Sequence, residues 1–214
     1  MKNPLISMTG TRVRRVISTS MPRTMGRFAS RKSGRTLYWE SQNELFLMIR
    51  LELDPRVLRF REQPVSVQLP IQGRSQKYTP DIYAEQSDGL FVYEVKPEAE
   101  LEEHAALFAA AEEFFGSHGY RYVVVTDKEL RQEPLLTNLK LLLKYAAYPI
   151  ASRAFDAARA VLVSTGGCPV GRLADALELH GGGLATVYAM VARGFISVPL
   201  RDKLLCTNSL ATWG

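Results

Sequence analysis

A short Asp88-Gly89 pair constrains this fold more than any other feature of the sequence. Asp-Gly between two apolar segments is typical of a tight turn that joins antiparallel strands. The flanking segments, 81–85 and 90–96, have strand composition, so we predict a β-hairpin over residues 81–96. The nearly continuous apolar run at 120–126 predicts a further strand that is buried on both faces.

Helical patterns surround these strands. Apolar residues at 45, 48, 49 and 53 fall on one face of a helix that we expect from Glu40 to Leu53, with Ser41 as N-cap and Glu44 in capping-box spacing. Helices are also predicted over 101–116 and 135–148, strands over 57–61 and 65–69, and a loop over 72–76. This order predicts an α/β domain with a mixed central sheet flanked by helices.

The residues after Pro149 have a different organisation. Their patterns predict helices over 152–163, 169–179 and 184–193, followed by a hairpin formed by 195–200 and 204–207. Three helices and a hairpin resemble a winged helix-turn-helix, a module that binds DNA or protein. We therefore predict three parts: a basic flexible arm over 1–35, a main domain over 36–149, and a small winged-helix-like domain over 150–214.

Positive charge is concentrated at the N-terminus. The net charge is +5, yet residues 1–35 carry nine basic and no acidic side chains, which leaves −4 for the remainder. Such a block favours a polyanion, because each phosphate that is neutralised releases counterions; the alternative is a solubilising tail. The residues that we predict to contact DNA are Arg12, Arg14, Arg15, Arg23, Arg27, Arg31, Lys32 and Arg35.

Other classes of protein are disfavoured by composition. The chain has no apolar run of membrane-spanning length and no apolar stretch typical of a signal peptide, so we expect a cytoplasmic protein. Cys168 and Cys206 are far apart and are expected to be free thiols. The three histidines are scattered, which disfavours a structural zinc site.

The predicted hairpin brings charged side chains together. Glu94 and Lys96 project on the same side of their strand, and Asp81 begins the strand that pairs with it. Two neighbouring carboxylates repel each other unless a cation lies between them, and hard oxygen ligands suit Mg²⁺. Glu44, on the preceding helix, could add a third carboxylate. The alternative is an ordinary solvated strand face with a cross-strand ion pair.

These residues resemble a known nuclease pattern. Pro80-Asp81 with Glu94-Val95-Lys96 is similar to the motif of the PD-(D/E)xK nuclease superfamily, whose restriction-endonuclease-like fold has a mixed central sheet. Residues 40–64, Tyr78-Thr79-Pro80-Asp81, Tyr93-Glu94-Val95-Lys96-Pro97 and the segment 123–129 resemble the N-terminal domain of TnsA endonucleases. The resemblance covers roughly residues 20–150.

The resemblance implies a site and a biological role. It implies metal ligands Glu44, Asp81, Glu94 and the carbonyl of Val95, with Glu40 as the rival for the helix position, and a catalytic Lys96. It implies Mg²⁺, with Mn²⁺ as a substitute and two ions per site. The chain would cleave the 5′ ends of a transposon, beside a TnsB-like transposase and a TnsC-like AAA+ ATPase. The alternatives are a restriction- or repair-type nuclease that acts alone, and a DNA-binding adaptor without activity.

Overall fold

The structure is a computed structural model that describes residues 5–6 and 25–214. It divides into two compact units. The first unit contains the chain up to Glu52 and the segment Arg56–Arg131, and the second contains Leu53–Pro55 and Gln132–Gly214.

A four-stranded sheet forms the centre of the first unit. Its order is β3 (Val57–Glu62), β6 (Ile82–Gln86), β7 (Gly89–Lys96) and β8 (Arg121–Thr126). The first three strands are antiparallel and β8 runs parallel to β7, so the predicted mixed sheet is confirmed. Gln86 pairs with Gly89, which has a φ of 150°, so the Asp88-Gly89 turn also lies where it was predicted.

One strand is exposed where the sequence predicted burial. The apolar run at 120–126 was expected to be buried on both faces, but in β8 only Val125 is buried and Arg121 is exposed. The reason is position: β8 is the last strand of the sheet and has a neighbour on one side only.

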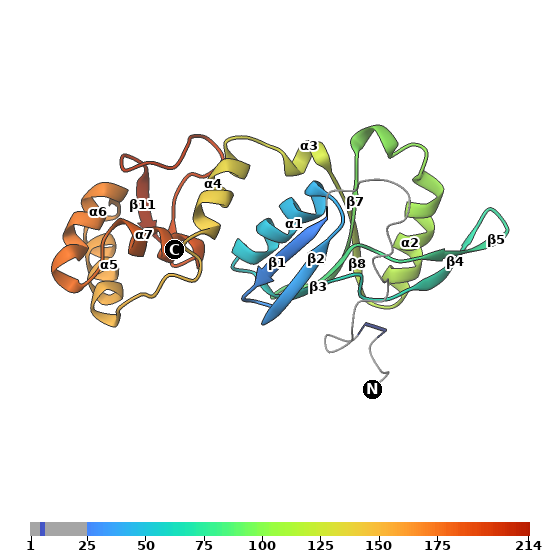
Figure 1. Ribbon diagram of the computed structural model, residues 1–214, viewed down its shortest axis with the longest axis horizontal. Helices are drawn as coiled ribbons and strands as arrows, with labels where there is room; N and C mark the ends of the chain where they lie inside the picture. The colour runs from blue at the N-terminus through green and yellow to red at the C-terminus, as the bar shows by residue number, and fades with distance from the viewer. Residues whose placement is uncertain (1–4, 7–24) are drawn as a thin grey trace. The chain divides into compact units, whose positions relative to one another are not determined.

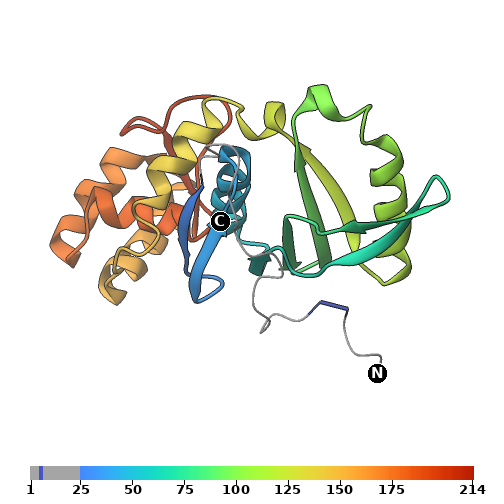
Figure 2. The same cartoon turned by 45° about the vertical axis from the view of Figure 1, so that its right-hand side comes forward.

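The two faces of the sheet are covered by different elements (Figures 1 and 2). Helix α1 (Gln42–Leu53) and the hairpin of β1 (Gly26–Ser30) and β2 (Arg35–Trp39) lie on one side. Helix α2 (Ala105–Ser117) and the hairpin of β4 (Val67–Ile71) and β5 (Arg74–Tyr78) lie on the other. Short helical turns, η1 (Glu98–Glu100) and α3 (Asp127–Leu130), precede α2 and follow β8.

Apolar burial explains this arrangement. On the α2 side, Val67 and Leu69 of β4 join Val92 of β7 and Phe115 of α2 in one buried cluster. On the other side, the Phe28 ring lies 6.4 Å from that of Phe60. Each buried side chain of this size contributes about 1.5–3 kcal/mol, so both hairpins are fixed by burial as well as by backbone pairing.

Two local predictions need correction. The segment 72–76 was predicted to be a loop, but only Gln72 and Gly73 form the turn, and residues 74–76 belong to β5. That strand is polar and exposed, so it lacks the alternating pattern from which strands are predicted. The helix predicted from Leu101 begins at Ala105, because residues 98–104 form a 3-10 turn and a bend before it.

The predicted flexible arm is too long. Residues 26–39 form the β1–β2 hairpin, in which Phe28 and Leu37 are buried. The buried carboxylate of Glu52 anchors its turn, accepting hydrogen bonds from Ser30 Oγ at 2.7 Å and from the Arg31 N–H at 2.9 Å. Basic residues and few apolar ones obscured this hairpin in the sequence.

The second unit consists of helices and a small sheet. Its elements are α4 (Leu135–Leu143), α5 (Ser152–Thr165), β9 (Cys168–Pro169), α6 (Val170–Leu177), η2 (Glu178–His180), α7 (Leu184–Ala192), β10 (Ile196–Ser197) and β11 (Leu210–Trp213). The short strands pair in the antiparallel order β10-β11-β9. The three helices predicted after Pro149 are present with small changes in their ends.

Helix α4 belongs to this second unit, so the units divide before the predicted boundary at 149. Its buried Asn138 donates to the carbonyls of Leu200 and Lys203 and accepts from the Leu205 N–H, each at 2.8 Å. These bonds hold the segment 200–205 in a loop. The hairpin predicted from 195–200 and 204–207 is therefore wrong, and β10 pairs with β11 instead.

Two further predictions concern thiols and membranes. Cys168 and Cys206 are free thiols, as predicted. None of the helices in the described residues combines the length and the apolar character that crossing a bilayer requires.

Candidate active site

Strand pairing places Asp81 beside Glu94. Ile82 pairs with Tyr93, so Asp81, the residue before β6, lies opposite Glu94. The Asp81 N–H donates to the Tyr93 carbonyl at 3.2 Å, and the Val95 N–H donates to Asp81 Oδ2 at 2.7 Å. The Asp81 carboxylate is therefore held against the backbone of β7, close to the next acidic side chain.

Glu94 and Lys96 lie on the same face of β7, as the strand period predicted. Lys96 Nζ lies 3.7 Å from Glu94 Oε1, while Glu94 is buried and Lys96 is half-buried. Val95, whose carbonyl the family resemblance implies as a metal ligand, lies between them in the strand and is half-buried.

The third carboxylate comes from the first turn of α1. Ser41 Oγ accepts a hydrogen bond from the Glu44 N–H at 3.1 Å, and Glu44 Oε2 accepts one from the Glu40 N–H at 2.9 Å. Bonds of this capping kind fix the start of the helix and the direction of its acidic side chain. Glu40 is the alternative acid, and its Oε1 accepts from Gln63 Nε2 at 3.3 Å.

All four predicted catalytic residues, and Val95, line one cavity of about 870 Å³. This volume lies in the range of ligand and substrate sites. Carboxylates, basic side chains and several uncharged polar groups share its wall, so the cavity is polar. The lining residues are Glu40, Ser41, Gln42, Asn43, Glu44, Gln76, Lys77, Tyr78, Thr79, Asp81, Glu94, Val95, Lys96, Pro97, Glu100, His104, Leu107 and Arg131.

The carboxylates perturb one another. Burial, followed by the charges of Glu94 and Glu44, raises the pKa of Asp81 well above its ordinary value, against the opposing effects of the Val95 N–H and Lys96. Burial also raises the pKa of Glu94, against the opposing hydrogen bond from Tyr78 and the charge of Lys96. The charge of Glu44 is among those that raise the pKa of Asp81, which supports the choice of Glu44 as the helix acid.

Two tyrosines complete the site and were not foreseen. The Tyr78 hydroxyl donates to Glu94 Oε2 at 2.7 Å and lies 2.8 Å from the Tyr122 hydroxyl. Burial raises the pKa of both phenols, so both stay protonated and can donate. Tyr78 belongs to the Tyr-Thr-Pro-Asp stretch singled out in the sequence, whereas Tyr122 stands in an apolar run that indicated only a core strand.

The structure separates the predicted DNA-binding residues into two groups. Arg35 forms a bidentate pair with the buried Glu62, at 3.1 and 2.6 Å, and Lys32 Nζ donates to the Leu51 carbonyl at 3.0 Å. These two side chains are engaged within the fold. Arg27 and Arg31 are exposed, so their contact with DNA stays a prediction. Arg12, Arg14, Arg15 and Arg23 lie outside the described residues.

The donor set of the cavity is chemically suited to a hard divalent cation. It offers carboxylate oxygens that repel one another, and the positive charge of Lys96 offsets this repulsion only in part. A bound divalent cation would reduce the remaining repulsion. In their present positions, Glu94 is bound to Tyr78 and Lys96, and no three His, Cys, Asp or Glu side chains of the described residues converge as metal ligands. Cation binding would thus require a side-chain rearrangement.

A family comparison agrees with this geometry. Residues 54–127 match the family model described as TnsA-like endonuclease N terminal. This region is a TnsA-like endonuclease domain. The match spans β3 to β8 and contains Asp81, Glu94 and Lys96, while Glu44 precedes it. A search of curated proteins gives no match.

Proposed function

We propose that this protein is a divalent-cation-dependent DNA endonuclease, the TnsA-type subunit of a heteromeric transposase that cleaves the 5′ ends of a transposon. One observation carries the proposal. Asp81, Glu94 and Lys96 from the β6–β7 hairpin and Glu44 from α1 line the same cavity, in which burial and the charges of Glu94 and Glu44 raise the pKa of Asp81. The TnsA-like match over the same strands supports it.

The acidic residues are assigned to metal binding. Asp81, Glu94 and Glu44, with the Val95 carbonyl, would hold Mg²⁺, or Mn²⁺ as a substitute, with two ions in the full site. Bound Mg²⁺ supplies positive charge for the scissile phosphate and a more acidic water. Lys96 would orient the attacking water or neutralise charge that develops on the phosphate oxygens. Tyr78 would hold Glu94 through its hydrogen bond.

The second unit is assigned to a protein partner. Its elements after α4 follow the order helix, strand, helix, helix, strand, strand, which supports a winged-helix-like module. In DNA-binding modules of this kind the helix at the position of α7 enters the major groove. Here α7 has no charged side chain, and seven of its nine residues are buried, from Thr186 to Ala192. These properties favour protein binding, and we propose a TnsC-like ATPase as the partner.

The decisive experiment measures strand-specific cleavage. The chain is incubated with Mg²⁺, a TnsB-like transposase and DNA that carries the transposon ends, and Asp81→Asn is compared with Asp88→Asn. Asp88 is exposed at the other end of the same hairpin, so it is a matched control. We expect Asp81→Asn to abolish 5′ cleavage and to leave 3′ cleavage, with Asp88→Asn unchanged. Undiminished 5′ cleavage by Asp81→Asn would refute the site.

The alternatives predict different results in the same experiment. Efficient cutting of DNA by the single chain without a transposase would favour a restriction- or repair-type nuclease. An adaptor without activity would cut under neither condition, and calorimetry would detect no binding of Mg²⁺ or Mn²⁺.

A further inference from the structure

We propose that the β4–β5 hairpin is a DNA-binding ribbon that holds the duplex beside the catalytic cavity. The hairpin consists of Val67–Ile71, the turn Gln72-Gly73 and Arg74–Tyr78. The inference rests on the proposed nuclease function. It adds a surface for the substrate that is distinct from the basic N-terminal residues.

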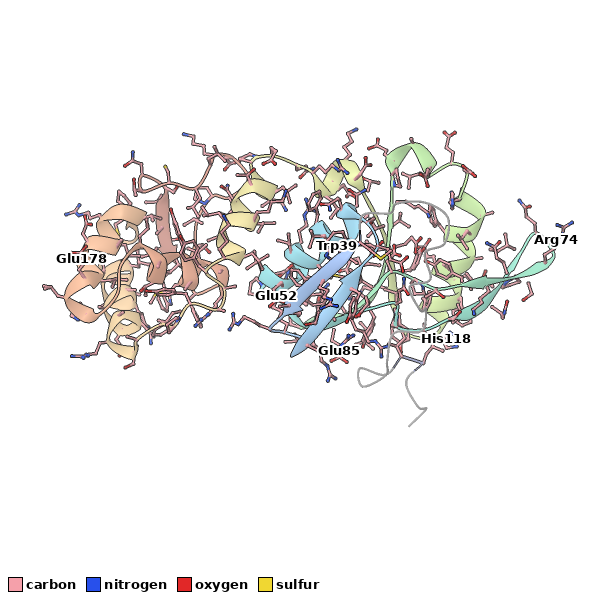
Figure 3. All side chains as sticks on the ribbon, in the orientation of Figure 1. Trp39, Glu52, Arg74, Glu85, His118 and Glu178 are labelled. Atoms are coloured by element: carbon pink, nitrogen blue, oxygen red, sulfur yellow. The ribbon has the colours of Figure 1, made fainter. Side chains whose placement is uncertain are left out.

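The hairpin is stiff and prominent. Its two-residue turn has positive φ at both positions, 49° at Gln72 and 77° at Gly73, which is the tight turn that matches the twist of paired strands. Figure 3 shows Arg74 at the end of the hairpin, projecting away from the body of the unit. A rigid element of this kind loses little conformational entropy when it binds a partner.

Most of strand β5 is exposed to solvent. The apolar residues of β4, Val67 and Leu69, are buried in the cluster beneath α2, so they anchor the hairpin. In β5, by contrast, residues 74–77 are all exposed, and within the described part of the chain β5 pairs with β4 alone. The hairpin therefore presents four consecutive exposed polar side chains on a strand whose partner is anchored by burial.

Charge favours a polyanion as the occupant of this edge. Between Gln63 and Pro80 the chain has no acidic residue, and its two charged side chains are the basic Arg74 and Lys77. The other side chains exposed on the hairpin include Gln68, Ser75 and Gln76, which can hydrogen-bond to phosphates and to base edges.

The base of the hairpin lies at the proposed catalytic cavity. Gln76 and Lys77, near the end of β5, line the same cavity as Asp81, Glu94 and Lys96. Only Thr79 and Pro80 separate the end of β5 from Asp81, and the last residue of β5, Tyr78, is itself bound to Glu94. A phosphate backbone that follows β5 would therefore arrive at the carboxylates.

The dimensions also suit duplex DNA. A two-stranded ribbon fits into the major groove. Arg74 at the tip and Lys77 near the base are three residues apart in β5, a separation of roughly 10 Å, which corresponds to about three base pairs of rise. The two side chains could thus contact phosphates about three base pairs apart.

The test measures DNA affinity of the full chain in EDTA, which prevents cleavage. Fluorescence anisotropy with a labelled duplex of about 30 base pairs is recorded over a series of salt concentrations. The variant Arg74→Gln/Lys77→Gln is compared with Arg59→Gln/Arg121→Gln, which removes the same charge from the same unit. Arg59 and Arg121 pair with Glu85 and Asp88 at the opposite end of the sheet.

We expect the ribbon variant to bind about tenfold more weakly, with a salt slope reduced by about 2, since each phosphate contact contributes about 0.9. The control should keep the slope of the original chain. Equal slopes for all three proteins would overturn the ribbon assignment and leave this edge to a protein partner. Asp81→Asn separates the two proposals, because it should bind DNA normally and fail to cut. Cleavage by Asp81→Asn would refute the catalytic site, whatever the ribbon variant does.

Discussion

Replacing Tyr78 by Phe tests how the site keeps a buried carboxylate in place. The Tyr78 ring packs edge-on against Phe115 and Tyr122, with centroids 6.4 Å apart in each case, and Phe retains that packing. The hydroxyl makes a bond of 2.7 Å to Glu94 and one of 2.8 Å to Tyr122. The first, to a charged acceptor, is worth about 1.5–3 kcal/mol, and the second about 0.5–1.5. We expect the free energy of unfolding to fall by about 2–4 kcal/mol at about pH 8.

The loss should depend on pH in a defined direction. Burial raises the pKa of Glu94 above its ordinary value, and the Tyr78 hydrogen bond opposes that rise. Without the hydroxyl the pKa rises further. At low pH Glu94 is protonated in both proteins and two neutral hydrogen bonds are lost, which together cost about 1–3 kcal/mol. As pH increases through the raised pKa, the carboxylate ionises and the stability difference between the two proteins widens.

Urea denaturation in EDTA, from about pH 5 to about pH 8, measures this difference. The chain has two tryptophans, and Trp39 lies in the first unit, so a Trp213→Phe background makes the fluorescence specific for that unit. Tyr122→Phe is the matched control, because it loses only the tyrosine–tyrosine bond and should cost about 1 kcal/mol at every pH. A Tyr78→Phe loss that does not change with pH, or that equals the control, would refute the role of Tyr78.

Four further substitutions test other parts of the first unit. Asp81→Asn removes a negative charge that Glu94 and Glu44 repel. In urea titrations in EDTA it should therefore raise the free energy of unfolding by about 1 kcal/mol, and a decrease would contradict the electrostatic account. Glu52→Ala deprives Ser30 Oγ and the Arg31 N–H of their acceptor and should cost about 2–4 kcal/mol by the same assay, against no change for the exposed Glu178→Ala. Arg35→Gln leaves the Glu62 carboxylate buried without its partner and should cost about 2–3 kcal/mol, with the salt slope of DNA binding unchanged. Arg27 is exposed, so Arg27→Gln should lower the salt slope of DNA binding by about 1 and leave the free energy of unfolding unchanged. Identical behaviour of the two arginine variants would be inconsistent with their different environments.

The parts of the fold that were predicted correctly depend on local signals. Strand β7, its turn at Asp88-Gly89 and helix α1 each follow from periodicity or turn chemistry within a few residues. The same signals predicted that Asp81 lies next to Glu94 and Lys96, because antiparallel pairing across a short turn places the two strands side by side. Most of the candidate site could therefore be derived from the sequence.

The missed parts depend on packing between distant segments. Strand β5 is polar on both sides, so no periodicity marks it, and it forms because β4 is anchored beneath α2. The Tyr78–Tyr122 contact joins residues 44 positions apart, on β5 and β8, and it exists only once both strands have packed around Phe115. In the β1–β2 hairpin, Arg35 resembled a phosphate ligand because the sequence does not show that Glu62 is buried opposite it.

The acidic cluster argues for chemistry because folding alone would not select it. A structural ion pair would need one carboxylate beside Lys96, and Glu94 already fills that position. Burial, followed by the charges of Glu94 and Glu44, raises the pKa of Asp81 and disfavours its ionisation. An amide at Asp81 could still accept the Val95 N–H without that cost. Tyr78, the Val95 N–H and Lys96 each favour the ionised form of a neighbouring acid, but they offset the effect of burial only in part, because the pKa of both Asp81 and Glu94 stays raised. A bound divalent cation would supply the positive charge that these carboxylates lack, which is how cation-dependent phosphodiester cleavage uses such a site.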